Sequence, residues 1–318
     1  MTTNSLASNR TLKLEPSTPV ATTTPKREFT WGKFFGWAFL ILVLLVTLFP
    51  FYWILRTALS TNSALAANST QLLPVDFSWG GFKRVLGLQT AAEAAAEGGS
   101  LADIAFWSSL RNSVLVATMV TLAQVFIAAM AAYAFSRLKW PGRSVVYSAF
   151  LAGLLIPSIF TIIPNFLTVR DLHLFDSIFG IAIPTIFMTL PFAIFFLRQF
   201  FMGISVEIEE AALLDGAGRF RTFATIIVPM ALPSIFTLGV LTYIATWNDY
   251  MWPLLVSQTE QSRTLTLALG VFRAQSPQTA PDWSGLMAAT LLAALPTLIL
   301  FMLFAKRIVN SIGFSGIK

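Results

Sequence analysis

The sequence contains no cysteine and a single histidine, and both shortages exclude classes of functional site. Without cysteine there can be no disulfide, no thiol nucleophile and no thiolate metal site. His173 cannot form a histidine cluster, and its position between Asp171 and Asp176 favours an exposed loop residue over a proton relay. We therefore expect this chain to bind neither a metal nor a cofactor.

Charged residues are scarce as well, at 11% of the chain against about 25% in a typical soluble domain. Hydrophobic residues make up 56% of the sequence and fall in long blocks, which is typical of a membrane protein. The net charge of +6 could suggest nucleic acid as a partner. However, the basic residues do not gather with aromatic residues into one face, so they are better explained as flanks of membrane spans.

The apolar blocks predict an all-α membrane protein with six transmembrane helices. The predicted spans are about residues 34–55, 113–135, 144–169, 177–197, 222–248 and 283–305. At about 1.5 Å per residue, each run can cross a hydrocarbon core of about 30 Å. Residues 1–30, rich in Ser, Thr and Pro, are expected to form a disordered tail before a transmembrane domain over 31–318. A cleaved signal peptide is the alternative for the first run, although its apolar stretch is longer than such peptides usually have.

The distribution of Lys and Arg predicts the orientation of the chain. About two thirds of these 21 residues lie in the two terminal segments and in the loops that six spans would place on the same side. Because positive residues are enriched in cytoplasmic loops, both termini and the loop 198–221 are expected in the cytoplasm.

No charged residue lies inside any of the six runs, whereas carriers driven by protons or ions usually need such residues. The chain also lacks the G-x-x-x-x-G-K-[ST] pattern of a nucleotide site. Prolines interrupt runs three to six, which indicates either kinked helices around a pathway or simply the commonness of Pro in membrane helices. If this chain moves a cargo, its energy is therefore expected to come from a partner.

The loop 198–221 is a charged interruption between two apolar runs. Ser205 can cap a helix that begins at Val206, and Gly216 should end that helix after Asp215. Acidic Glu210 lies beside small alanines, a combination suited to the close approach of a partner with a basic residue. The alternative is a loop lying on the bilayer, which an acidic helix disfavours.

The spacing E-A-A-x3-G-x9-I-x-[LV]-P occurs in this stretch, and it resembles the signature loop of permease subunits of bacterial ABC importers. It is met by Glu210, Ala211, Ala212, Gly216, Ile226, Val228 and Pro229. The blocks 111–113, 132–137 and 247–254 are similar to carbohydrate importers of the maltose-permease type, in their shorter six-span subunit. The likeness covers roughly residues 30–318. Ser205 stands where that family often has Pro, and Ser can cap the same helix start.

The resemblance implies a permease fold in the bacterial plasma membrane and a transport subunit that is not itself an enzyme. A second permease, expected to be a different chain, would complete a pathway for a sugar or oligosaccharide. Two separate ATPase subunits would use ATP and Mg, and an extracellular solute-binding protein would deliver the cargo. An importer of another small solute such as glycerol-phosphate, a secondary carrier and a membrane protein without cargo remain as alternatives.

The resemblance also implies which residues couple to the ATPase: Glu210, Ala211, Ala212, Asp215 and Gly216. Candidates for the sugar path come instead from residue chemistry, since such a path needs polar groups and aromatic faces. They are Gln124, Asn165, Trp247 and Asn248. For the polar candidates the alternative is hydrogen bonding between helices, and for Trp247 it is anchoring at the membrane interface.

Overall fold

The computed structural model describes residues 31–68, 70–100, 104–276 and 281–313, with side chains described as far as residue 305. The expected disordered tail lies outside the described residues. Contacts divide the chain into two units, 1–49 and 50–318, and each is described by itself. Residues 31–49 are the apolar, helical first part of α1 (Trp31–Ala58), and the remaining features belong to the second unit.

The described residues are almost entirely helical, with a single isolated β-bridge between Ser60 and Phe77, so the all-α prediction is confirmed. Within the part of the chain that the structure describes, four helices are long and apolar enough to cross a membrane. They are α1, α5 (Phe106–Ser136), α8 (Ile178–Met202) and α15 (Trp283–Gly313). The prediction of six spans holds when each of two bent helix pairs is counted as one span.

The two bent pairs correspond to the predicted spans over 144–169 and 222–248, for which the prolines had indicated kinked helices as one of two interpretations. In the first, α6 (Arg143–Gly153) meets α7 (Ser158–Asp171) at 98°, with Pro157 immediately before α7. Pro disfavours a helical conformation for the residue before it, so the helix ends there. The second pair, Arg219–Met230 and Leu232–Trp247, meets at 76° and begins with α10 (Arg219–Thr222).

Two helix-breaking features explain the second bend. A π-helical turn at Phe223–Ile227 precedes α11 (Val228–Met230), which contains Pro229. The next helix, α12 (Leu232–Trp247), carries Pro233 at its start. Since Pro removes a backbone donor and a π-turn disturbs the hydrogen-bond ladder, both are usual causes of a sharp kink.

At the centre of the second unit, α5 packs against α8 and α12, and α12 packs against α15. The α5–α8 contact uses small residues, because Ala128 and Ala132 of α5 and Ala193 of α8 are all fully buried in one cluster. Small side chains let membrane helices approach closely. These three helices, α5, α8 and α12, also line the cavity described below.

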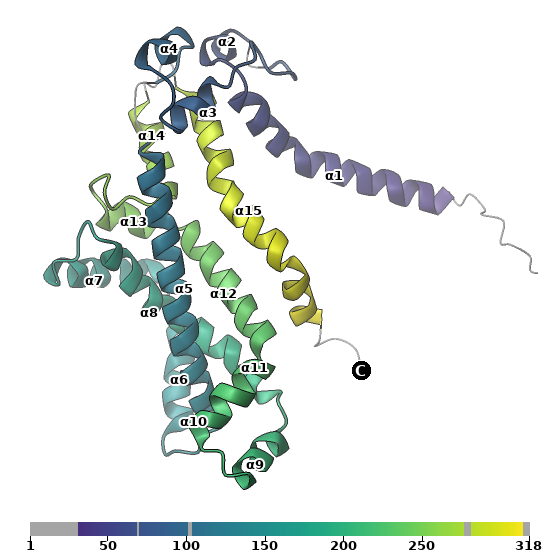
Figure 1. Ribbon diagram of the computed structural model, residues 1–318, viewed down its shortest axis with the longest axis vertical. Coiled ribbons are helices and arrows are strands. Elements are labelled where there is room, and N and C mark those ends of the chain that lie inside the picture. Colours follow the sequence, from purple (N-terminus) through teal and green to yellow (C-terminus); the bar gives the residue numbers. More distant parts are fainter. Residues whose placement is uncertain (1–30, 69, 101–103, 277–280, 314–318) are drawn as a thin grey trace, which may run out of the picture. The chain divides into compact units, whose positions relative to one another are not determined.

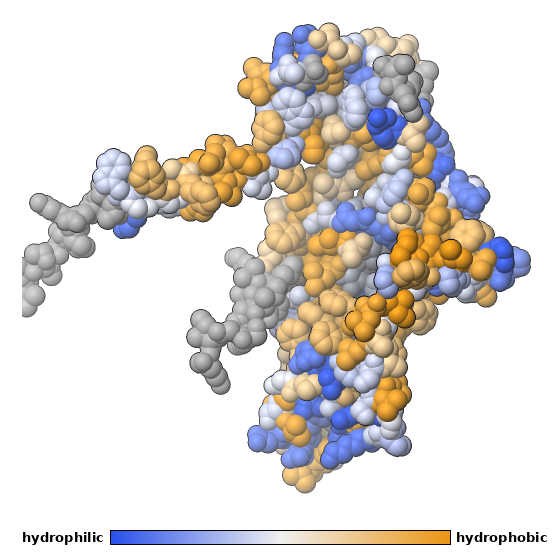
Figure 2. Space-filling view, turned by 180° about the vertical axis from the view of Figure 1, so that it is seen from behind, coloured by the Kyte–Doolittle hydropathy of each residue, from blue (hydrophilic) through white to orange (hydrophobic). Residues whose placement is uncertain are grey.

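The polar ends of this unit lie on opposite sides of the apolar middle (Figure 1). One end carries α2 (Asn62–Ala67), α3 (Gly80–Val85) and α4 (Ala91–Ala96), and the other carries α9 (Val206–Leu214) and α10. Two further helices, α13 (Met251–Val256) and α14 (Leu265–Gln275), follow α12. Figure 2 shows hydrophilic side chains gathered at the α9 end and hydrophobic side chains over the middle of the face in view.

Candidate functional site

The loop 198–221 folds as the local sequence predicts. Ser205 caps α9, its hydroxyl accepting a hydrogen bond from the Glu207 N–H at 3.3 Å, and the helix begins at Val206. Asp215 is the C-cap, and Gly216 follows with φ of +80°, a left-handed conformation that favours glycine. No heavy atom lies within 4 Å of a Cβ placed on Gly216, so the backbone conformation alone demands glycine there.

Four of the five residues expected to couple to a partner are exposed on this loop. Glu210, Ala211, Asp215 and Gly216 all face away from the protein. Ala212 departs from the expectation: it is only 7% exposed, so in this conformation it packs inward instead of facing outward.

The two most exposed large apolar residues of the loop were not selected by sequence reasoning. Leu214 is 89% exposed at the end of α9, and Phe220 is 74% exposed on α10. Large apolar side chains that project from a polar loop are typical of an interaction surface. Both residues fall in the loop 198–221 predicted from the sequence, but neither was selected there as a contact residue.

The α9 helix is anchored by a buried ion pair that the sequence did not reveal. Arg137 Nε lies 3.0 Å from Glu209 Oε1, and both side chains are less than a tenth exposed. The N–H does not point along the N–O line, so the contact is electrostatic and not a hydrogen bond. Arg137 also donates to the carbonyl oxygens of Phe201 and Ile204. It therefore joins the end of α5 to the end of α8 and to α9.

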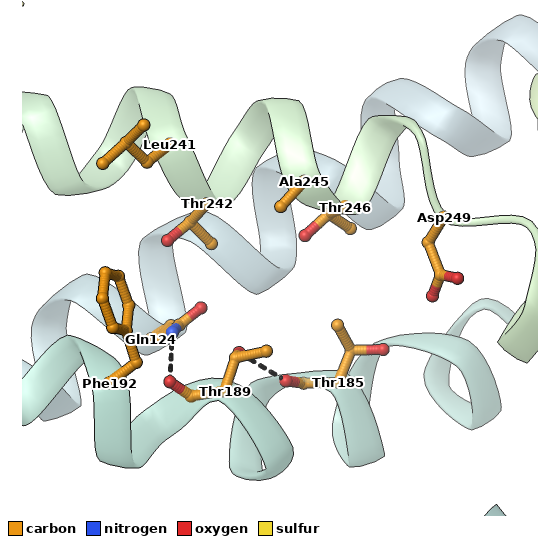
Figure 3. A pocket seen from close by; sticks show the side chains of 9 residues that line it. All are labelled: Gln124, Thr185, Thr189, Phe192, Leu241, Thr242, Ala245, Thr246 and Asp249. Atoms are coloured by element: carbon orange, nitrogen blue, oxygen red, sulfur yellow. Dashed lines mark hydrogen bonds between the residues drawn. The ribbon is translucent and has the colours of Figure 1, made fainter. Parts of the chain in front are cut away.

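A cavity of about 510 Å³ lies between α5, α8 and α12 (Figure 3). It is lined by Gln124, Thr185, Thr189, Phe192, Leu241, Thr242, Ala245, Thr246 and Asp249. Small-molecule sites typically have volumes of about 300–1,000 Å³, with a few polar groups among apolar ones. Four hydroxyls, one amide and one carboxyl meet this description.

Gln124 lines one end of this cavity, and the NH2 group of its amide is held in place by a hydrogen bond. Its Nε2 donates to the Thr189 carbonyl oxygen at 3.1 Å, which fixes the amide orientation because a carbonyl can only accept. Its Oε1 is buried and has no hydrogen-bond partner among the described residues. Leaving a buried acceptor unpaired costs about 1–3 kcal/mol, so such a group indicates a missing partner.

Asp249 lies at the other end of the same cavity, just beyond α12 (Figure 3). Burial raises the pKa of this carboxyl above its ordinary range, while the backbone N–H groups of Trp252, Met251 and Tyr250 act in the opposite direction. The Trp252 N–H reaches Asp249 Oδ1 at 3.5 Å, at the start of α13. Asp249 thus lies directly before Tyr250, the N-cap residue of α13, and also forms part of the cavity wall.

The other three residues predicted for a sugar path do not line this cavity. Trp247 is buried and donates from Nε1 to the Ala293 carbonyl oxygen at 3.2 Å, so it packs α12 against α15. Asn248 is exposed and donates to the Ile244 carbonyl within its own helix end. Asn165 lies on α7. The residues missed by sequence reasoning are the α8 and α12 threonines, whose spacing along each helix was the available signal.

A second cavity of about 620 Å³ lies between α5, α12 and α15 and is almost wholly apolar. Its few polar side chains include Thr121 and Tyr243. The cavity on the other side of α12 differs from it in being lined by four threonines. Among the described residues, no group of three or more His, Cys, Asp or Glu could hold a metal ion.

Comparison with known proteins gives one family and several full-length relatives. The family model described as "Binding-protein-dependent transport system inner membrane component" matches residues 124–313. The "Trehalose/maltose transport system permease protein MalG" of Thermococcus litoralis is 28% identical, over 87% of this chain and 94% of that protein. The "Diacetylchitobiose uptake system permease protein DasC" of Streptomyces coelicolor is 28% identical, over 85% and 91%.

A solved structure has the same fold. It is the crystal structure of a bacterial ABC transporter involved in the import of the acidic polysaccharide alginate, with a TM-score of 0.73 and 25% identity. The match covers 88% of this chain and 99% of the solved chain.

Proposed function

The chain belongs to the family of inner membrane components of binding-protein-dependent transport systems, and from this premise we propose that it forms part of a sugar pathway driven by a separate ATPase. It is a multi-pass ABC importer permease, a transport component and not a catalytic subunit. The proposed further subunits are a second, different permease, two ATPase subunits and an extracellular solute-binding protein. The termini and the loop 198–221 would lie on the cytoplasmic side, where the ATPase is.

The exposed surface formed by α9 and α10 is the single observation that carries the coupling role. It combines the exposed Glu210 carboxylate with the exposed apolar side chains of Leu214 and Phe220. A partner with a basic residue beside an apolar cleft would complement all three groups. Interfaces of this kind concentrate their binding energy in a few anchoring residues.

The buried pair behind α9 supports a mechanical connection to the membrane helices. Arg137 holds Glu209 of α9 and the backbone at the end of α8, and it follows directly after α5. Movement of α9 with an ATPase would therefore pull on α5 and α8, two of the three helices that wall the 510 Å³ cavity. Rigid-body motion of this sort is a known route to alternating access.

A neutral sugar is the cargo that the cavity supports best. Its described lining has hydroxyls, an amide, a carboxyl and an aromatic ring, and it contains no Lys or Arg. An anionic cargo such as glycerol-phosphate would gain from a positive group and would be repelled by Asp249. The sugars named for the permeases MalG and DasC are trehalose, maltose and diacetylchitobiose, which are uncharged.

The test compares variants of the α9 surface in the assembled importer. Glu210→Ala and Leu214→Ser should each reduce co-purification of the ATPase with this chain, and ATP-driven uptake, by about tenfold or more, as expected for anchoring residues. Gly216→Ala should do so as well, because alanine is strained at positive φ. Glu260→Ala, an exposed carboxylate in the loop after α13, is the matched control and should change neither. Unchanged co-purification and uptake in all three α9 variants would overturn the coupling proposal.

A further inference from the structure

The cavity between α5, α8 and α12 has three kinds of group that recognise a carbohydrate, and they face one another (Figure 3). Thr242 and Thr246 of α12 lie across from Thr185 and Thr189 of α8. Phe192 lies beside Gln124 at one end, and Asp249 lies at the other. Sugars carry hydroxyls around a ring whose two faces are partly apolar, so a site for them needs polar groups at its edges and an aromatic face.

The hydroxyls on the two walls differ in the hydrogen bonds that remain available. Thr185 and Thr189 donate to the Ile181 and Thr185 carbonyl oxygens at 2.8 Å, which leaves their oxygen atoms free to accept. Thr242 and Thr246 make no side-chain hydrogen bond with any described residue, so each can donate as well as accept. The α8 hydroxyls can therefore only accept hydrogen bonds from a ligand, whereas the α12 hydroxyls can both accept and donate them.

Gln124 provides the strongest sign of a missing ligand. Its Oε1 is buried, lies at the floor of the cavity and has no partner among the described residues. The opposite end of its amide is held by the Thr189 carbonyl, so the side chain cannot satisfy Oε1 by turning over. A ligand hydroxyl seated on the floor would donate the hydrogen bond that Oε1 lacks.

The cavity also restricts the class of ligand. Asp249 is the one ionisable group among the described residues of the lining, so an acidic sugar would be repelled and a neutral one would find an additional acceptor. Phe192 is 45% exposed at the rim and presents a ring face toward the cavity. Thr189, Leu241 and Ala245 are exposed too, so the cavity opens at the surface between α8 and α12.

We propose that this cavity is a binding subsite for a neutral sugar ring within this subunit, with Gln124, Thr242, Thr246 and Asp249 as its hydrogen-bonding groups. The inference rests on the proposed transport function and goes beyond it. It assigns sugar contacts to this chain itself and ties them to the two helices that Arg137 connects to α9. It also predicts discrimination against acidic sugars, in contrast to the alginate importer whose fold is similar.

Transport by the complete importer in proteoliposomes tests the subsite, with trehalose, maltose and diacetylchitobiose as probes. Gln124→Leu and Thr246→Val each remove one hydrogen-bonding group at nearly constant volume. Each should raise the KM for the transported probe by about two- to tenfold, the value of one hydrogen bond. Thr121→Val is the matched control, because its buried hydroxyl is equally unpartnered among the described residues but faces the apolar cavity. It should leave the KM within about twofold.

The absence of cysteine allows a second, direct measurement. Thr246→Cys and Thr121→Cys place single thiols in the two cavities without any other change to this chain. The transported probe should slow modification of the first thiol by a small thiol reagent and leave the second unaffected. Unchanged KM values together with no protection at position 246 would overturn the subsite while leaving sugar transport intact. Another outcome is that the unsubstituted importer takes up a uronate oligosaccharide and none of the probes. That result would contradict both the neutral cargo and this subsite, but it would not contradict coupling through α9.

Discussion

Each end of the second unit holds a buried pair of arginine and carboxylate, and the two pairs are built differently. At the α2–α4 end, Arg84 Nε lies 2.7 Å from Asp282 Oδ2, and the Asp282 side chain is fully buried. Arg84 also donates to Gln89 and Ser284. Asp282 in turn accepts from the backbone N–H groups of Ser100 and Gly285 at 2.9 and 2.8 Å.

The pair at the α9 end has fewer supports. Arg137 has Glu209 and two carbonyl oxygens as partners, and no further hydrogen bond to Glu209 is found among the described residues. A buried charge with several partners is over-determined, because losing one contact leaves the others in place. The Glu209 carboxylate has Arg137 as its one partner among the described residues, so it depends on that contact alone. The first arrangement suits a rigid cap, and the second suits a joint that must move.

The largest effect should come from breaking the pair at the rigid end. Asp282→Ala leaves the Arg84 charge buried without its main counter-ion, which typically costs about 3–5 kcal/mol. The loss should appear as faster hydrogen exchange and proteolysis over residues 59–100, since those residues depend on this network. Asp171→Ala breaks the exposed Arg170–Asp171 pair and serves as the control, with an expected change within about 0.5 kcal/mol. Equal effects of the two substitutions would contradict the ranking.

Breaking the Arg137–Glu209 pair should reduce the coupling of ATP hydrolysis to uptake more than it reduces the stability of the fold. Glu209→Gln keeps the shape of the side chain and removes its charge, so α9 should remain folded but lose its hold on α5. We expect the importer to assemble and to hydrolyse ATP with uptake per ATP reduced by about five- to thirtyfold, which corresponds to a loss of about 1–2 kcal/mol. Glu207→Gln, an exposed acid on the same helix, is the control.

A double substitution separates this role from simple damage to the fold. Arg137→Met combined with Glu209→Gln removes both charges, so no uncompensated charge stays buried. If the pair acts as a joint, the double variant should recover stability but not coupling. Recovery of both would show that the pair serves the fold alone.

The sequence predicted these regions unequally, for physical reasons. Local signals sufficed for α9, because a Ser cap and a left-handed Gly depend on neighbouring residues only. The partner of Glu209 could not be predicted, since Arg137 is far away along the chain and a lone basic turn does not specify its counter-ion. The block 111–113 stood out in the sequence only as a similarity to carbohydrate importers. In the structure Asn112 is fully buried and donates to the Gln261 carbonyl at 2.7 Å, which makes it a structural tie.

Prediction of the cavity from the sequence was limited in the same way, by contacts between distant segments. Gln124 was found because a polar residue in an apolar run is conspicuous. Threonine is common in membrane helices, so Thr242 and Thr246 become significant only when α8 is seen to face α12. Trp247 was chosen for its aromatic face, yet its N–H and ring are used in packing. Which side of a helix faces a pathway depends on contacts between distant segments, and periodicity alone does not supply them.

The smallest expected effect concerns a third carboxylate, which is held by neutral donors instead of an arginine. Partial burial acts to raise the pKa of Asp176, but hydrogen bonds from the N–H groups of Thr259 and Gln258 and from the Ser262 hydroxyl more than offset it, so the pKa lies below its ordinary value. Because the folded state favours the carboxylate, this contribution is complete above the unfolded pKa of about 3.9 and is lost as the pH falls through the lower folded value.

Asp176 ties the loop before α8 to the segment after α13, so acid should loosen that contact without releasing either end of the unit. Asp176→Asn should remove the part of the pH dependence below about pH 4 and leave thermal stability at pH 7 reduced only slightly, because the carboxylate is near the surface. The measurement is the thermal transition of the purified protein between about pH 3 and pH 7, with Asp171→Asn as an exposed control. If Asp176→Asn destabilised the protein as strongly as Asp282→Ala, pairing with an arginine would not explain the difference between these two carboxylates. The different stability effects expected at the two ends of the unit would then need another cause.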